Sequence, residues 1–375
     1  MMLAEKWADA LLEEMREHGD PLADTLIADV MAVHGLDRLN QIMQSLVHNA
    51  DIVTGDMPEE IVDWLTATSQ LPTWADEELM QRGHEFFNLH WPNIVTLLFC
   101  ASLPSAYAAH KGAQVLWQTG RLTDQVHRRI FETAQFILDV MAPGGFNPNG
   151  MAIRASQKVR LIHASIRYYI LNVPHAKSTW NPEWGLPINQ EDMAGTLMTF
   201  SIQILQGLQR LGIPVTDDEA EAYLHAWKVV GHIMGVNPEL IPANVEAGFD
   251  LAYTIFDRQR GPSAAGEALT DALLAFLRQQ IPGRLLDGLP ATIMRYCIDD
   301  NVADMLGVPR SNWTIYLLWL EEKFWRLLDR LEIRYQRRAA VVTRYSHALL
   351  QGLVTIERGG NRPIFQIPSS LRAPM

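Results

Sequence analysis

The sequence predicts an all-α protein built as a single large helical domain, and three observations support that fold class. Apolar residues recur at helical spacing along most of the chain, and no segment sustains the two-residue alternation of a half-buried strand. Proline and glycine separate the helical segments, whereas no Ser/Gly-rich linker divides the chain. Eleven Trp and fifteen Met among 375 residues favour helices around a roomy apolar interior.

The composition argues against several classes of function. A net charge of −12 argues against nonspecific binding of nucleic acid, which needs a cationic surface. Cys100 and Cys297 are the only cysteines, so neither a disulfide framework nor a zinc site of several cysteines is available. That cysteine content suits a reducing cytosol. The N-terminus carries charges early and resembles a helix rather than a signal peptide, so we expect a cytoplasmic location.

The longest apolar runs are residues 94–103 and 313–320. Both are shorter than the ~20 residues of a membrane-spanning helix. We therefore expect two buried helices here and no transmembrane segment.

The predicted helices are bounded by residues that begin or end helices. Gly19-Asp20-Pro21 ends the first helix, and Thr73 with Asp76 has the spacing of a capping box. Asn189 and Thr216 each precede acidic residues that suit a helix N-terminus. We expect helices over 3–18, from there to about 34, two within 37–70, 74–103 with an interruption at Trp91-Pro92 and a stop at Leu103-Pro104, 121–141, 151–171, 190–210, 217–235, 242–260, 264–281, 286–306 and 311–337.

The stretch from Val159 to Arg167 is the most suggestive candidate for a site. On a helix, Arg160, His163 and Arg167 lie along one stripe. The apolar stripe, about 90° around the helix by the same geometry, consists of Val159, Ile162, Ile166 and Ile170. If that stripe is buried, an imidazole lies between two guanidiniums at the edge of the core. Such a set offers haem an axial nitrogen for iron and positive charge for the propionates. The alternative is a core histidine with two solvated arginines.

A second polar face is predicted on the helix over 121–141. Arg129, Glu132, Thr133 and Phe136 share one side of it. A guanidinium, a carboxylate and a hydroxyl beside an aromatic ring can orient dioxygen and handle a proton. The alternative is an ordinary ion pair of Glu132 with Arg128 or Arg129, with Thr133 simply packed.

Other catalytic motifs are missing from the sequence. It contains no Gly-rich phosphate loop, no His-Glu-x-x-His zinc motif and no Gly-x-Ser-x-Gly nucleophile elbow. The Glu-x-x-His pairs of di-iron helix bundles are missing as well. The central histidine therefore remains as the main candidate for chemistry.

Several segments occur in the order and spacing of a known family. They are Thr119-Gly120-Arg121-Leu122, Arg129-x-x-Glu132-Thr133, Val159 to Arg167, Trp184-Gly185-x-Pro187-Ile188-Asn189-Gln190-Glu191-Asp192, Trp227 to Gly235, Arg295-Tyr296 and Ala303-Asp304-x-Leu306-Gly307. Together they resemble the MpaB/rubber oxygenase family, which includes the latex clearing proteins. The resemblance spans residues 75–310.

The resemblance implies a globin-like helical core that holds haem b, with dioxygen as co-substrate. It implies that His163 is the proximal iron ligand. It also implies that Arg160 and Arg167 support this ligand or the propionates, with Arg295 as a further cofactor-binding residue.

On the distal side, Arg129 and Thr133 match an Arg-x-x-Lys-Thr pattern of rubber-cleaving members. The lysine of that pattern is Glu132 here. Those members also carry a catalytic glutamate before this helix, whereas this chain has no acidic residue between Phe86 and Thr123. We expect Glu132 to move a proton or order water in its place. Rubber-cleaving members add dioxygen across a double bond of polyisoprene. Because this chain starts without a secretory signal, we expect a smaller apolar, unsaturated substrate.

The sequence suggests three parts. Residues 1–70 form an N-terminal helical region packed on the core, residues 71–345 form the MpaB/rubber oxygenase-like domain, and residues 346–375 form a partly irregular extension. Three functions stay open: a haem oxygenase, a haem-binding sensor or carrier, and a helical scaffold that has lost its cofactor. The polar distal face favours the oxygenase, and intact His163 with both arginines argues against the scaffold.

Overall fold

The computed structural model describes residues 7–35, 37–38, 40–41, 57–119, 124–177, 179–279 and 287–310, and the fold is an all-α single domain. Within these residues the only β-type pairing is an isolated bridge between Ala109 and Arg260. The predicted fold class is therefore confirmed. The elements of the first half are α1 (Asp9–Met15), α2 (Pro21–Val33), α4 (Glu59–Thr68), α5 (Glu77–Leu97), the π-helix η1 (Leu98–Ser102), α6 (Leu103–Ala108), α7 (Ala113–Thr119), α8 (Asp124–Met141) and α9 (Ala152–Asn172).

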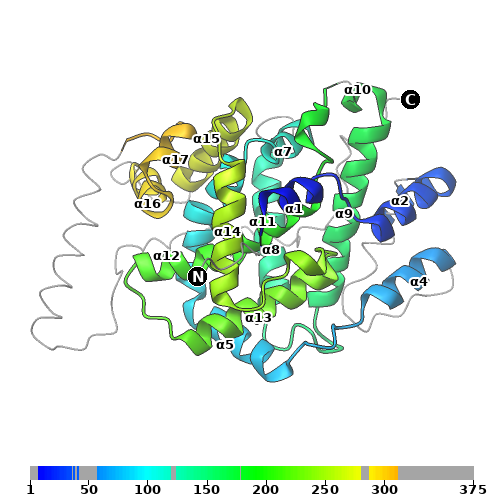
Figure 1. Ribbon diagram of the computed structural model, residues 1–375, viewed down its shortest axis with the longest axis horizontal. Helices are drawn as coiled ribbons and strands as arrows, with labels where there is room; N and C mark the ends of the chain where they lie inside the picture. Colours follow the sequence, from blue (N-terminus) through cyan, green and yellow to red (C-terminus); the bar gives the residue numbers. More distant parts are fainter. Residues whose placement is uncertain are drawn as a thin grey trace, which may run out of the picture.

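The second half of the described residues is helical as well (Figure 1). Its elements are α10 (Pro174–Lys177), the 3₁₀ turn η2 (Pro182–Trp184), α11 (Gln190–Phe200), α12 (Ile202–Arg210), α13 (Asp217–Ile233), the 3₁₀ turn η3 (Pro238–Leu240), α14 (Val245–Gln259), α15 (Ala264–Gln279), α16 (Leu289–Ile298) and α17 (Asp300–Met305). The expected helix over 311–337, the apolar run 313–320 and the extension over 346–375 lie outside the described residues.

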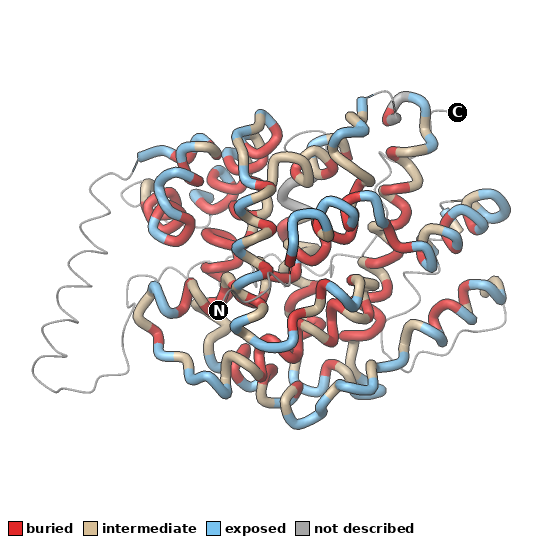
Figure 2. Tube along the Cα trace, viewed as in Figure 1, coloured by how far each residue is buried: buried red, intermediate tan, exposed pale blue. Residues whose placement is uncertain are grey.

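The main apolar core lies in the middle of the molecule, where buried residues concentrate in Figure 2. It joins α5, η1, α8, α11, α13 and α15, with α5 and α13 packed along each other. A second core cluster lies at one edge, where α2 and α4 pack beside α9, at the right of Figure 1. Helix α9 therefore contributes side chains to both cores, with Ala155 in the first and Leu161 and Ala164 in the second.

The predicted interruption at Trp91-Pro92 is wrong, because α5 continues through Pro92 to Leu97. Proline removes one backbone donor from a helix interior. Burial on both sides, with Phe87 before it and Ile94 after it, outweighs that local cost. The predicted stop at Leu103-Pro104 is also wrong. The chain passes through η1 into α6, where Pro104 occupies the first turn and its missing N–H costs little.

The residues that cap the N-termini of helices were predicted correctly, with one exception. Asn189 caps α11 by accepting a hydrogen bond from Asp192 N, and Thr216 with Glu219 forms a reciprocal capping box at α13. Thr73 is not a cap. Asp76 itself is the N-cap of α5 and accepts from the backbone N–H of Leu79.

Two predicted helices are each divided in the structure. The segment expected over 190–210 separates at Ser201 into α11 and α12. The segment expected over 286–306 separates at Asp299, which has a φ of 71° and caps α17 by accepting from Val302 N. Neither break follows a proline or glycine, so the positions of these helix-ending residues do not predict the two breaks.

One described segment is long and apolar enough, by length and composition, to cross a membrane. It runs over Glu77–Ala108, and 61% of its apolar window is buried inside the protein. A core helix passes the same test, which agrees with the packing of α5 against α13.

Candidate functional site

The two arginines of the polar stripe on α9 are more deeply buried than most of the apolar stripe beside it. Arg160 is 7% exposed and Arg167 is 2% exposed, whereas Ile162 and Ile166 are only half-buried. The expectation that the arginines lie at the edge of the core is therefore wrong. A buried guanidinium needs a carboxylate partner, and both arginines have one.

Those partners come from the N-terminus of α2. Asp20 accepts from Arg160 Nε at 2.5 Å through Oδ2 and from Nη2 at 2.8 Å through Oδ1. The remaining nitrogen, Nη1, donates to the carbonyl of Ile233 at 3.0 Å. Asp24, one helical turn further along α2, accepts from Arg167 Nε at 2.8 Å. The two arginines that bracket His163 thus bind the same short segment.

His163 lies between these two ion pairs and has a neutral ring. Burial, and then the positive charge of Arg167, lowers its pKa to about 4, against a smaller opposing effect of Asp20. Its Nδ1 is buried and meets no hydrogen-bond partner among the described residues. The residue as a whole stays only half-buried. An unprotonated imidazole without competing hydrogen bonds fits the requirement for an axial haem ligand.

Helix α8, which carries the predicted distal residues, packs along α9. Arg129, Glu132 and Thr133 are half-buried there, and Phe136 is buried in the main core. Arg129 donates from Nη1 to the carbonyl of Leu116 at 2.9 Å. The structure thus brings the distal set and His163 onto neighbouring helices, although these residues are 30 or more positions apart.

The electrostatics of Arg129 differ from those of the arginines on α9. Burial lowers the pKa of Arg129, and Tyr107 and Glu132 act in the opposite direction. The phenol of Tyr107 is buried, which raises its own pKa, and Arg129 moderates that shift. Tyr107, from α6, is therefore a neutral hydroxyl close to the predicted distal residues, and no sequence pattern indicated it.

Arg295 lies in another part of the fold. Its guanidinium donates to Asp300 and Asp304 and to the carbonyls of Val308 and Pro309. These bonds tie α16 to α17, at the upper left of Figure 1, whereas α9 lies to the right. The predicted contact of Arg295 with a cofactor stays a prediction, and the bonds present explain its burial without one.

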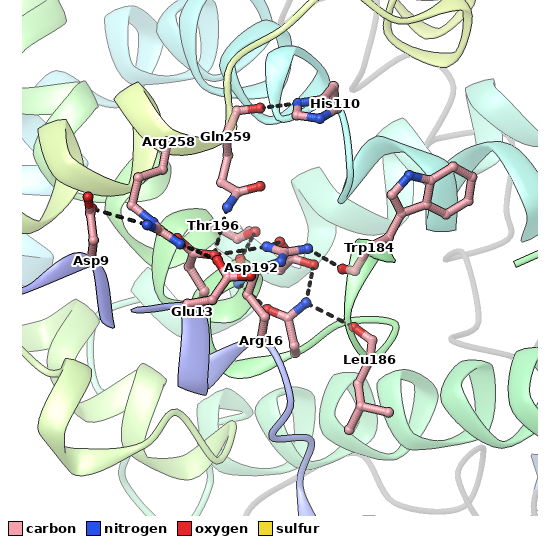
Figure 3. Close-up of polar contacts among 12 residues, drawn as sticks. Asp9, Glu13, Arg16, His110, Trp184, Leu186, Asp192, Thr196, Arg258 and Gln259 are labelled. Carbon is pink, nitrogen blue, oxygen red and sulfur yellow. Dashed lines mark hydrogen bonds and ion pairs between the residues drawn. The ribbon is translucent and has the colours of Figure 1, made fainter. Parts of the chain in front are cut away.

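A buried polar network occupies the centre of the molecule, and its core is Glu191. This carboxylate is 0% exposed and accepts from Arg16 Nη1 at 2.9 Å, from Arg258 Nε at 2.9 Å and from Gln259 Nε2 at 2.7 Å. Figure 3 shows Arg16 beside Asp192, to which it donates at 3.1 Å. The network joins the end of α1 to α11 and α14.

The same network extends to the surface at one end. Figure 3 shows Arg258 reaching Asp9 and Glu13 of α1, at 3.0 and 2.7 Å. At the other end, the backbone N–H and ring Nδ1 of His110 lie 3.0 and 2.8 Å from the carbonyl of Gln259. From the sequence, Glu191 and Asp192 were predicted as acids in a first helical turn and as part of a family-like segment. The burial of Glu191 could not be predicted, because its partner Arg16 is 175 residues away.

The structure places a neutral histidine on α9 and the polar residues Arg129, Glu132 and Thr133 on the neighbouring α8 of an all-α domain. Comparison with known proteins gives the family of this domain. Residues 89–332 match the family model described as "ER-bound oxygenase mpaB/B'/Rubber oxygenase, catalytic domain". The chain belongs to this family of oxygenases, and the predicted membership is confirmed.

Two relatives define the likeness further. The rubber oxygenase of Streptomyces sp. (strain K30) is 26% identical over 295 residues, which cover 78% of this chain and 71% of that protein. A solved structure of latex clearing protein LCP in the closed state superposes with a TM-score of 0.79 at 24% identity, over 91% of each chain. This second likeness concerns the fold.

Proposed function

We propose that this protein is a haem-b-dependent oxygenase that uses dioxygen to oxidise or oxidatively cleave an apolar, unsaturated small molecule, with His163 as the proximal iron ligand. Family membership supports oxygenase chemistry. The name of the Streptomyces relative, rubber oxygenase, supports an apolar, unsaturated substrate. Haem and the ligand assignment rest on the chemistry of the His163 side chain.

The observation that carries the proposal is the state of that imidazole. A metal-binding histidine must present an unprotonated ring nitrogen. With a pKa of about 4, His163 is neutral at physiological pH, and its buried Nδ1 has no hydrogen-bond partner among the residues described. A buried polar nitrogen without a hydrogen-bond partner is costly unless a ligand compensates it.

The two flanking arginines differ in whether they keep an unpaired hydrogen-bond donor. All three donor nitrogens of Arg160 are already bound by Asp20 and by the carbonyl of Ile233. Arg167 keeps its Nη2 buried and without a partner among the described residues. We therefore assign a propionate contact to Arg167 first, with Arg160 contributing positive charge and support for the helix.

When bound, haem b supplies the iron that activates dioxygen. The residues of α8 do the remaining work. Arg129 and Thr133 donate hydrogen bonds that orient dioxygen, and Glu132 holds or delivers a proton. Because these three side chains are half-buried, they combine shielding from bulk water with room to meet a small molecule.

The test is the absorbance spectrum of purified protein from cells supplied with haem, with His163→Ala beside it and His34→Ala, at an exposed histidine, as the matched control. We expect a Soret band in the wild type and in His34→Ala, and loss or displacement of the band in His163→Ala. Circular dichroism confirms that the variant is folded. Absence of the band in the wild type would overturn the haem assignment.

A haem-binding sensor or carrier is the second candidate, because a neutral histidine that would hold the haem iron serves it equally well. Oxygen uptake separates the two functions. Uptake stimulated by terpenes, carotenoids, unsaturated lipids or polyisoprene identifies an oxygenase and its substrate class. A stable haem spectrum without substrate-dependent uptake across this panel identifies the carrier.

A further inference from the structure

We infer that residues 16–24, which precede the segment matched by the family model, complete the His163 site and hold its imidazole in position. We call these residues the clasp. The inference rests on the proposed function for the role of His163, and on the contacts of the clasp for everything else. The family model begins at residue 89.

The clasp binds the two arginines on either side of His163. Asp20 takes two hydrogen bonds from Arg160, and Asp24 takes one from Arg167. The two pairs are seven residues apart on α9, which is about two helical turns. His163 thus lies on a stretch of helix that is fixed at both ends by the same segment.

The clasp also binds residues 184–192, which are another of the segments that resemble the family. Arg16 donates to Glu191, to Asp192 and to the carbonyl of Trp184. In the backbone, Leu186 N donates to the carbonyl of Arg16, and Gln190 N donates to the carbonyl of His18. The clasp is therefore held by main-chain and side-chain bonds together.

At two positions in the family-like segments, the clasp lies so close to the backbone that only glycine fits. Gly235 has a φ of 82°, and a Cβ there would lie 2.7 Å from Oδ2 of Asp20 and 2.7 Å from Cζ of Arg160. Gly185 has a φ of 73°, and its Cβ would lie 2.7 Å from the carbonyl oxygen of Arg16. Both positions need glycine for conformation and for space. The motif glycines thus fit a chain in which the clasp is present.

These contacts assign a role to Asp20 that goes beyond holding α2. Its carboxylate neutralises Arg160, which also stacks over the ring of Trp64 with Cζ 5.7 Å from the centroid. Without that carboxylate, a buried guanidinium loses its charge partner and must seek another position. Because Arg160 is one turn from His163, its movement changes the orientation of the imidazole. Asp20 is therefore a positioning residue that acts through Arg160.

The experiment uses the full-length, haem-loaded protein and three variants. Asp20→Asn keeps the shape and removes the charge. Val30→Ala weakens the packing of α2, because Val30 is fully buried in the second core cluster. It removes no hydrogen-bond partner of Arg160 or Arg167. Asp9→Asn removes an exposed acid of the same terminal region, which pairs with Arg258.

Two readouts separate positioning from general stability. They are the rate of haem loss to excess apomyoglobin and the iron–histidine stretching band in resonance Raman spectra. We expect Asp20→Asn to lose haem roughly 10-fold faster, as for other residues that orient a metal ligand, and to shift or broaden the band. Val30→Ala lowers the melting temperature but keeps the band, and Asp9→Asn behaves as the wild type.

The inference is overturned if Asp20→Asn keeps the wild-type band and haem-loss rate, or if Val30→Ala changes both as much. Failure of the proposed function gives a different result, namely a wild type without a Soret band. In that case the clasp is tested in the apoprotein by the ¹⁵N signals of the His163 ring. Asp20→Asn must alter them and Val30→Ala must leave them in place, and any other pattern rejects the clasp.

Discussion

Asp20 and Arg160 form a two-point ion pair in the interior, with Nε–Oδ2 at 2.5 Å and Nη2–Oδ1 at 2.8 Å and both side chains less than a tenth exposed. They are 140 residues apart in the chain. The pair places α2 against α9 and brings a carboxylate close enough to His163 to affect its pKa. One contact therefore links the N-terminal region, the second core cluster and the candidate iron ligand.

Breaking this pair from one side is expected to be costly. Asp20→Ala leaves the guanidinium of Arg160 buried without a charge partner and should reduce the free energy of unfolding by about 3 kcal/mol. The double variant Asp20→Leu/Arg160→Met removes both charges and should lose clearly less. Urea denaturation measures both. Equal losses would mean that packing, and not the ion pair, holds α2 to α9.

Glu191 provides a second test of buried charge. Glu191→Ala removes the carboxylate shared by Arg16 and Arg258, and should lower the free energy of unfolding by about 3–5 kcal/mol. Glu13→Ala is the matched control, because Glu13 pairs with Arg258 but its side chain is 65% exposed. Surface pairs of that kind contribute little. Thermal and urea unfolding of the two variants should therefore differ widely, and similar values would contradict a structural role for the network.

The sequence predicted what depends on local patterns. Helical spacing placed His163 between two arginines, and side-chain caps located the starts of α11 and α13 at Asn189 and Thr216. These features depend on residues within one or two turns, so the sequence contains the full signal for them. The position of the polar face of α8 followed from the same spacing.

Partners far apart in the chain could not be predicted in this way. Gly19-Asp20-Pro21 was interpreted only as the end of a helix, although Asp20 is both the N-cap of α2 and the partner of Arg160. The passage of α5 through Pro92 likewise depends on burial against other helices, which overrides a local preference. The one available signal was charge, because arginines such as Arg16, Arg160 and Arg167 require carboxylates once they are buried. The sequence did not indicate which carboxylates these are.

His84 should make the fold sensitive to acid. Burial lowers its pKa to about 4, against a hydrogen bond with the backbone of Val140, whereas an unfolded histidine titrates near 6.5. As the pH falls below 6.5, the unfolded chain binds a proton that the folded protein cannot accept. Stability therefore declines down to about pH 4, by at most about 3 kcal/mol from this group.

The check compares urea midpoints at pH 7 and pH 5. His84→Gln cannot take up the proton and should show a smaller loss between these two values than the wild type. His18→Gln, at an exposed histidine, is the control and should keep the loss of the wild type. If His84→Gln loses as much stability between pH 7 and pH 5 as the wild type, another group causes the acid sensitivity.

Glu132 is where this chain departs from the Arg-x-x-Lys-Thr pattern, and it should control the rate of oxygenation. It lies one turn after Arg129 on α8, close enough to affect the pKa of that guanidinium. If Glu132 delivers a proton, Glu132→Ala should reduce turnover on the order of 100-fold at unchanged haem content, and Glu132→Gln should do the same despite its similar size. Glu132→Asp should recover part of the rate, because it keeps the acid. Oxygen consumption with the substrate found in the panel measures the turnover of all three variants. An unchanged rate in Glu132→Ala would assign proton transfer to another group. The neutral phenol of Tyr107 is the first such group to test.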